Sequence, residues 1–371
     1  MREQAHQAKI RGFNAFGPLS EGNRILKTNH YYYIAFIILS ICAATLAIHL
    51  NHSEPSVNVA ENQSSQVQSE PVTSSISQSQ QQSSEELLAN EDESLDESIY
   101  DVELMKKNGI EAINPEDYAS VDEIINEQIT QLGIDPATVS IAFHNYLDDQ
   151  RYYLNENVFH NSASIYKVPL AAMVLDLVNS GVYSMDSQIP FQDSYYQEGA
   201  GAISNNELRP SYSIQELIDE SLIHSDNTAA WTLMMGIYGD FPSSRQALLD
   251  FLNYYDVPDN FYQDIYFSAN LIEMTYDKIM SDPAYEYIIT QLSQAEPHQL
   301  FTSYVKSGMA NKYGRYESMV NDSGIYYENG QPIYSLVILT DGAASADVFL
   351  EMTNLNINQW VRHQAGLDQR N

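Results

Sequence analysis

One uncharged apolar run divides this chain of 371 residues into two parts of opposite charge. The run, YYYIAFIILSICAATLAIHL at residues 31–50, contains no Asp, Glu, Lys or Arg, and as a helix it would be about 30 Å long, which matches a bilayer core. Five basic and two acidic residues precede it, a formal charge of +3; since the whole chain carries -33, the remainder carries -36. The pattern predicts a cytoplasmic basic segment at 1–30, a transmembrane helix at 31–50, and export of everything after it.

A cleaved signal peptide is the alternative to a membrane anchor. The run is long for the apolar region of a signal peptide, it starts only after residue 30, and no small-x-small cleavage site precedes the polar region that follows. A buried helix of a soluble domain is disfavoured because three consecutive tyrosines stand at one end, as in an interfacial aromatic belt. We therefore expect an uncleaved single-pass anchor.

Residues 51–98 predict a disordered, acidic tether. They are dominated by Ser, Gln, Glu and Asn, as in SSISQSQQQSSEE, and contain no aromatic residue before Tyr100. Such a segment buries too little apolar surface to offset the entropy lost on ordering. The folded domain is then expected at 99–371.

The pattern of the remaining chain predicts an α+β fold. Ser120 and Glu123 have capping-box spacing before an amphipathic helix, and Ser213 and Glu216 form a second such box. The middle of the domain, from about 164 to 292, is mostly helical in pattern. Strands are expected at 138–146, 151–154, 303–306, 324–327 and 334–340, and a last helix at 346–360. Strands at both ends around a helical middle indicate two lobes, with a site between them.

Composition excludes several classes of function. Beyond residue 30 the basic residues do not cluster, so the chain lacks the positive surface that nucleic-acid binding needs. The single cysteine, Cys42, can form no intramolecular disulfide, and the nine histidines form no H-x-x-x-H pair. We therefore expect no metal site and no nucleic-acid partner.

Three short motifs carry chemistry: S-x-x-K at Ser164 and Lys167, S-D-N at 225–227, and K-S-G at 306–308. Ser164 and Lys167 open an apolar helical run, where residues three apart share a face, so the amine can reach the hydroxyl. A second S-x-x-K at Ser303 and Lys306 falls in a strand-like segment, where residues three apart point to opposite faces. That second pair cannot form a dyad.

These residue types suit acyl transfer by a serine nucleophile. A lysine can take the proton of the Ser164 hydroxyl if burial and a second cation lower its pKa, and Lys306 is a candidate for that cation. A helix N-terminus at Ser164 would direct backbone N–H groups toward an oxyanion. Ser225 could pass a proton to a leaving nitrogen, and Asn227 could hold Lys167 or a substrate amide.

In this order the motifs resemble those of the penicillin-recognising serine hydrolases, specifically the class A β-lactamases and their relatives. The segment ISNNELRPSYSIQELIDESLIHSDNTAAWTLM is similar to the family's sequence around its second motif, and YYQEGAGAI resembles a glycine-bearing loop of many members. The resemblance covers about residues 100–364. It implies a five-stranded antiparallel sheet flanked by helices with an inserted all-helical lobe, a covalent serine intermediate and no cofactor.

The resemblance also implies roles for individual residues. Ser164 would be the nucleophile, Lys167 the general base and Ser225 a proton relay, while Asn227 would position the substrate and the lysine. Lys306 and Ser307, with Gly308, would bind the substrate carboxylate and relay protons. Backbone N–H groups of Ser164 and Met309 would form the oxyanion hole. Arg315 falls where some members keep a carboxylate-binding arginine.

One departure from the family concerns release of the acyl group. Class A enzymes have an E-x-x-L-N loop whose glutamate activates the hydrolytic water. This chain has no glutamate between Glu220 and Glu273, and only Asp256, Asp259 and Asp264 offer carboxylates in the shortened segment. We expect slow deacylation.

The sequence thus predicts a membrane-anchored, extracytoplasmic serine hydrolase that opens β-lactams or the D-alanyl amides of cell-wall peptides. The partner is a small-molecule or peptide substrate. The alternatives are a cell-wall D-alanyl-D-alanine peptidase and, from another class, a non-catalytic cell-wall-binding protein. The non-catalytic protein is disfavoured because binding alone needs no serine and lysine together.

Overall fold

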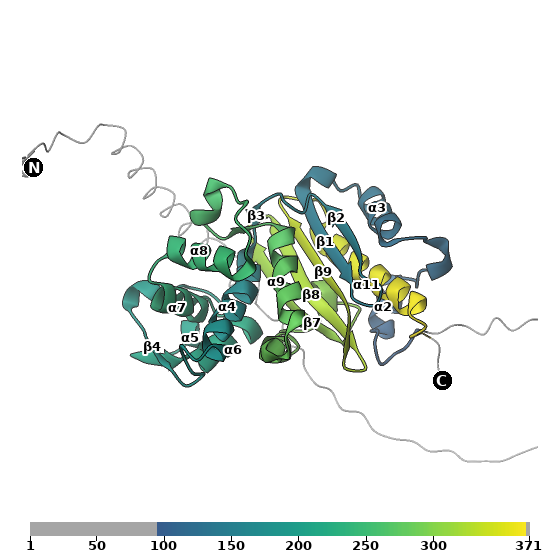
Figure 1. Ribbon diagram of the computed structural model, residues 1–371. Coiled ribbons are helices and arrows are strands. Elements are labelled where there is room, and N and C mark those ends of the chain that lie inside the picture. Colours follow the sequence, from purple (N-terminus) through teal and green to yellow (C-terminus); the bar gives the residue numbers. More distant parts are fainter. Residues whose placement is uncertain (1–94, 369–371) are drawn as a thin grey trace, which may run out of the picture. The chain divides into compact units, whose positions relative to one another are not determined.

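The computed structural model describes residues 95–368 (Figure 1). The basic segment 1–30, the apolar run 31–50 and the tether up to residue 94 lie outside the described residues. Within 95–368 no helix is both long and apolar enough to cross a bilayer. Ser98, which we assigned to the tether, already contacts the folded domain, because its carbonyl accepts a hydrogen bond of 2.8 Å from Ser307 Oγ.

A five-stranded antiparallel sheet forms the centre of the described domain, as predicted. Its strands lie in the order β2-β1-β9-β8-β7, so the first hairpin of the domain joins the last three strands of the chain. The strands are β1 (Val139–Asn145), β2 (Gln150–Leu154), β7 (Met309–Tyr316), β8 (Met319–Glu328) and β9 (Gln331–Thr340). Strand β7 pairs only with β8 and is an edge strand.

Helices cover both faces of the sheet, because its side chains alternate between two cores (Figure 1). On one face Ile141 and Phe143 pack with α2 (Val102–Asn108), α3 (Val121–Leu132) and α11 (Ala346–Gln364). On the other face Ala142, Val337 and Leu339 pack with α9 (Ala269–Ser281). The sheet is therefore apolar on both sides.

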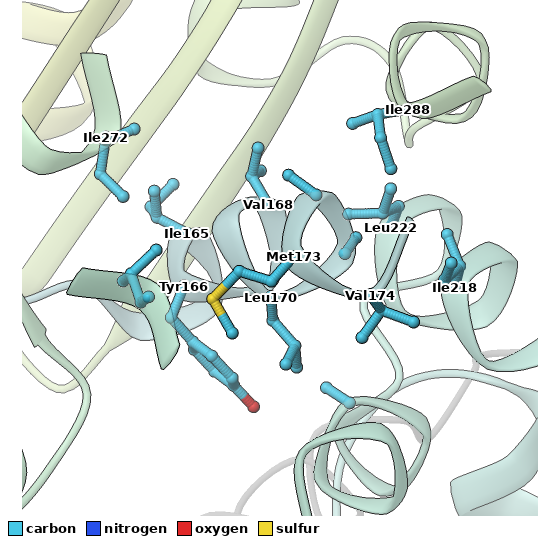
Figure 2. Packing of buried hydrophobic residues seen from close by; sticks show 14 of the residues in the cluster. Ile165, Tyr166, Val168, Leu170, Met173, Val174, Ile218, Leu222, Ile272 and Ile288 are labelled. Atoms are coloured by element: carbon cyan, nitrogen blue, oxygen red, sulfur yellow. The ribbon is translucent and has the colours of Figure 1, made fainter. Parts of the chain in front are cut away.

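The second core fills the helical lobe, whose central helix is α4 (Lys167–Asn179). Nine consecutive residues of this helix, 167–175, are buried. Figure 2 shows Val168, Leu170, Met173 and Val174 of this helix among side chains of neighbouring helices, such as Ile218, Leu222, Ile272 and Ile288. The lobe also contains α5 (Ala202–Asn205), α6 (Ile214–Ile223), α7 (Asn227–Tyr238), α8 (Phe241–Leu252) and α10 (Glu286–Leu292). A helix buried all round fixes the position of the residues at its N-terminus.

Short elements complete the fold. Two-stranded ladders join β3 (His160–Asn161) to β6 (Tyr266–Phe267) and β4 (Gln188–Pro190) to β5 (Ser211–Ser213). Short 3-10 helices occupy Pro115–Asp117, Pro136–Thr138, Ala163–Tyr166, Asp193–Tyr195, Asp259–Tyr262, Pro283–Tyr285 and Leu300–Thr302.

The structure corrects one predicted strand. Residues 303–306 follow a 3-10 turn and contribute only an isolated bridge, between Val305 and Tyr100. The strand of this region is β7, six residues farther along, which we did not predict. Ser213 is the N-cap of α6, since its side chain accepts from the Glu216 N–H at 3.2 Å, while the Glu216 carboxylate pairs with Arg209. Ser120 makes no side-chain cap bond; instead Glu123 accepts from the N–H of Ala119 at 2.7 Å.

Candidate active site

Ser164 lies in a 3-10 turn that runs directly into α4. Asn161 Oδ1 accepts from the N–H of Ala163 at 2.9 Å, and the N–H and Oγ of Ser162 both donate to the carbonyl of Ile265, at 2.9 and 2.8 Å. These bonds hold the turn against β6 and its preceding loop. The Ser164 N–H belongs to a first helical turn, where backbone donors have no intrahelical partner.

Lys167 is the central donor of the site. Its side chain is fully buried, and Nζ lies within hydrogen-bond distance of four oxygens: Ser164 Oγ at 3.0 Å, Ser225 Oγ at 3.2 Å, the Ser225 carbonyl at 2.6 Å and Asn227 Oδ1 at 2.7 Å. The structure therefore brings together four residues that the sequence singled out, from segments about 60 positions apart.

Burial lowers the pKa of Lys167 well below its usual range, and the nearby cation Lys312 lowers it further. Desolvation disfavours the ammonium form, and a like charge disfavours it again. The buried carboxylate of Asp226 opposes these effects. A lysine held partly uncharged can accept a proton from the Ser164 hydroxyl, which lies within hydrogen-bond distance.

The turn before α7 presents Ser225 and Asn227 to Lys167. Ser225 adopts a left-handed backbone conformation, with φ at 57°. Asp226 caps α7 by accepting from the Ala229 N–H at 2.8 Å, and it also accepts from Ser204 Oγ at 2.8 Å. A Cβ at Gly199 would stand 2.3 Å from Asn227 Nδ2, so the glycine-bearing loop packs directly on this turn.

The third element of the site is Lys312-Tyr313-Gly314 on β7, which sequence reasoning missed. Lys312 is almost completely buried, and burial lowers its pKa to about 8. A Cβ at Gly314 would stand 2.6 Å from the Ser164 nitrogen, so only glycine lets the strand approach the serine this closely. Lys312, and not Lys306, is the second cation that acts on Lys167.

The predicted residues 306–309 lie elsewhere. The Lys306 N–H donates to the Ile99 carbonyl and Ser307 Oγ to the Ser98 carbonyl, so this segment fastens the start of the domain. Met309 is five residues before Gly314 on an extended strand, roughly 16 Å away at about 3.3 Å per residue. Met309 therefore cannot share an oxyanion with Ser164. The expected placement of the third motif at 306–308 was wrong, because that segment is not in the strand that meets Ser164.

Arg315 contributes its backbone to the site. Its partner across the ladder, Val320, bonds through both its N–H and its carbonyl to Thr340 Oγ1, at 3.0 and 2.7 Å. The pair Arg315–Val320 is thus a non-hydrogen-bonded pair, so the Arg315 N–H points to the free edge of β7. The Arg315 side chain instead forms an ion pair with Asp347 at the start of α11.

Three aspartates were considered as substitutes for the missing glutamate. Asp256, Asp259 and Asp264 are all exposed. Asp264 precedes Ile265, whose carbonyl holds Ser162, and its carboxylate accepts from the Ile265 N–H at 2.7 Å. Asp264 is therefore the neighbour in sequence of the residue whose carbonyl holds the turn that carries Ser164.

Arg245 packs against the loop that carries Asp264, and nothing in the sequence indicated this role. Its guanidinium is buried, lies over Phe241 and Phe267 at 4.4 and 4.6 Å from the ring centroids, and donates to the Asp264 carbonyl at 3.4 Å. Burial lowers its pKa to about 9. The loop rests on a cation held by aromatic faces.

One group of possible metal ligands, His144, Glu273 and Asp277, lies on the sheet and α9. Arg151 Nη1 donates to Glu273 at 2.7 Å and to Asp277 at 2.8 Å, so a protein cation already offsets part of the charge of these two carboxylates. The group reads as an ion-pair network that joins β2 to α9.

Comparisons with known proteins agree with this geometry. Residues 121–242 match the model of the β-lactamase enzyme family. The fold is similar to that of a β-lactamase from Xanthomonas campestris, with 19% identity, a TM-score of 0.55, and coverage of 66% of this chain and 100% of that one. A variant of the reconstructed last common ancestor of Gram-negative class A β-lactamases gives 15% identity, a TM-score of 0.56, and coverage of 66% and 99%. An acyl-enzyme complex of a PBP-A variant with penicillin G gives 14% identity and a TM-score of 0.54. The match covers 67% of this chain and 96% of that one.

None of the curated proteins compared with the chain shows a significant match. The family match and the shared fold confirm the resemblance to β-lactamase-like serine hydrolases that the motifs indicated.

Proposed function

We propose that this β-lactamase-like chain is a serine hydrolase that opens β-lactams, or the D-alanyl amides that they imitate, through an acyl-enzyme on Ser164. The observation that carries the proposal is the contact between the buried Lys167 amine and the Ser164 hydroxyl, at 3.0 Å. Burying a lysine amine costs desolvation free energy, so the buried pair lowers the stability of the fold. A binding protein would need neither the lysine nor the serine at this position.

Acylation follows from the positions of these groups. The uncharged Lys167 amine takes the Ser164 Oγ proton as the oxygen attacks the carbonyl carbon, and the carbonyl electrons move to its oxygen. The N–H groups of Ser164 and Arg315 would bind that oxyanion, which replaces the predicted pair with Met309. When the C–N bond breaks, the proton returns from Lys167 through the Ser225 hydroxyl, 3.2 Å away, to the leaving nitrogen.

The test is covalent labelling by a fluorescent penicillin, with intact-mass detection of the adduct. Ser164→Ala should abolish labelling, and Lys167→Ala should slow it by about 10² to 10⁴, as expected when a general base is removed. Ser303→Ala is the matched control, because Ser303 belongs to the other S-x-x-K and bonds to Glu351. It should leave labelling unchanged. Labelling that survives the loss of Ser164 would refute the mechanism and favour a binding protein.

The second proposed step, deacylation, would be slow with β-lactams. The short loop 256–267 offers no glutamate, and its aspartates are exposed. A cell-wall D-alanyl-D-alanine peptidase therefore remains the second candidate, since slow release of a β-lactam acyl group is compatible with efficient turnover of a peptide.

The proposal includes a location. The charge difference across the 31–50 run supports a single-pass anchor with the catalytic domain outside the cytoplasmic membrane, where cell-wall peptides and β-lactams are found.

A further inference from the structure

A carboxylate stands beside the third motif. Glu296, in the exposed connection between α10 and the 3-10 turn Leu300–Thr302, accepts a hydrogen bond of 2.9 Å from the hydroxyl of Tyr313. Tyr313 lies between Lys312 and Gly314, where the K-S-G pattern expected for the family has a small hydroxyl residue. The hydroxyl at this position, that of Tyr313, thus donates to an acidic side chain.

Glu296 also lines a pocket of about 440 Å³ next to the Ser225 turn. The lining residues are Gly201, Ala202, Ile223, His224, Gln294 and Glu296. None of them is Lys or Arg, and Glu220 adds a second carboxylate where it accepts from the Ala202 N–H at 3.0 Å. In the proposed mechanism Ser225 protonates the leaving nitrogen, so substituents of the leaving group would lie toward this pocket, whose lining residue His224 precedes Ser225.

Two nearby cations, Lys312 and Arg315, interact with acidic side chains. Lys312 faces the carboxylates of Asp322 and Glu296, which both act on its charge. The Arg315 side chain is paired with Asp347 of α11, while Gly314, its neighbour, meets Ser164. Lys306 and Ser307, which we expected to bind a carboxylate, fasten residues 98 and 99 instead. Within residues 95–368, no Lys or Arg lines the pocket that holds Glu296.

We infer that the site selects against a free carboxylate on the leaving-group side and prefers acyl donors in which that group is uncharged, such as a carboxamide. The inference rests on the proposed function, whose substrate class it specifies. A substrate carboxylate would meet Glu296 across the pocket, and like charges at close range oppose binding. A carboxamide can instead donate its N–H groups to the Glu296 carboxylate.

The experiment compares two matched pairs of substrates on the full-length protein in detergent. One pair is benzylpenicillin and its carboxamide, followed by the rate of adduct formation in intact mass. The other pair is an N-acetylated L-lysyl-D-alanyl-D-alanine and its C-terminal carboxamide, followed by release of D-alanine or D-alaninamide. Assays are run at pH 8, where histidine side chains are ordinarily uncharged.

The wild-type protein should react faster with both carboxamides than with the acids. Glu296→Gln should raise the rate for the acids roughly tenfold, the effect of one unit charge near a protein surface. It should slow the carboxamides, because their N–H groups lose a charged acceptor. Glu286→Gln, an exposed glutamate on α10, is the control and should leave all four rates unchanged.

Two results would overturn the inference in distinguishable ways. A wild-type preference for the free acids that Glu296→Gln leaves intact would refute the charge selection while leaving the acyl-enzyme established. No adduct with any substrate, in a protein that is folded by circular dichroism, would refute the proposed function and the inference with it.

Discussion

At the scale of single residues, the site depends on how two buried lysines share one environment. Lys167 and Lys312 each lose solvation, and the charge of Lys312 lowers the pKa of Lys167 further. Asp226 partly offsets this effect at Lys167, and Asp322 does so at Lys312. The base is therefore tuned by burial first and by its neighbour second.

This arrangement predicts the pH dependence of acylation. Because only uncharged Lys167 can act as base, the rising limb of the acylation rate should lie at lower pH than the ordinary pKa of lysine. Lys312→Met removes a like charge, so the pKa of Lys167 should rise and the limb should move to higher pH. At pH values below the limb, each unit of movement lowers the rate about tenfold. The measurement is the acylation rate constant from pH 5 to 10.

Lys306→Met is the matched control, since Lys306 does not act on Lys167. It should leave the midpoint of the limb where it is. A midpoint that is also unchanged in Lys312→Met would contradict the assignment of Lys312 as the second cation.

At the scale of elements, the loop between α8 and β6 is where the proposed mechanism lacks a base for deacylation. This loop carries Asp264 next to Ile265, which holds the nucleophile turn, and it rests on the buried Arg245. It is well supported but lacks a glutamate.

We expect a burst of β-lactam opening followed by a slow steady state, because acylation has its groups in place whereas a base for the hydrolytic water is missing. Stopped-flow hydrolysis of a chromogenic cephalosporin measures both phases. Asp264→Asn should leave the burst amplitude unchanged, and Asp256→Asn serves as its control farther from the site. Fast multiple turnover without a burst would show that the missing glutamate has been replaced, and a loss of that turnover in Asp264→Asn would identify the replacement.

The elements also explain what the sequence could and could not predict. Ser164 and Lys167 were recognised because helical spacing is local and an apolar run follows them. The strand that carries Lys312 was missed because its segment, MANKYGRY, buries polar side chains such as Asn311 at a sheet edge and so lacks an alternating apolar pattern.

Tyrosine at 313 also removes the usual K-S-G or K-T-G pattern, while a K-S-G segment at 306–308 reproduces it by chance. Only the pairing of β7 with β8 shows that 312–314, and not 306–308, lies in the strand that meets Ser164. Arg245 left no recognisable signal, because an arginine enclosed by aromatic rings depends on side chains brought together by the fold.

At the scale of the whole molecule, the proposed anchor at 31–50 and the proposed export of the domain predict a topology. Protease added to intact cells or protoplasts should remove the large domain, since the charge distribution predicts that it lies outside. Immunoblotting for the C-terminal domain measures the loss, with a cytoplasmic protein as the internal control. Protection of the domain would contradict this orientation, and a mature N-terminus after residue 50 would mean that a signal peptide is cleaved.

The join between the start of the domain and its edge strand has a mechanical consequence. The backbone of Tyr100 pairs with Val305, and residues 98 and 99 bond to 307 and 306, a few positions before the strand that carries Lys312 and Gly314. Tension on the preceding chain, such as a tethered enzyme would feel when it is bound to an immobile wall, would load these bonds first. These bonds would have to break before the force could displace β7, so they would protect the geometry of the active site from tension on the preceding chain.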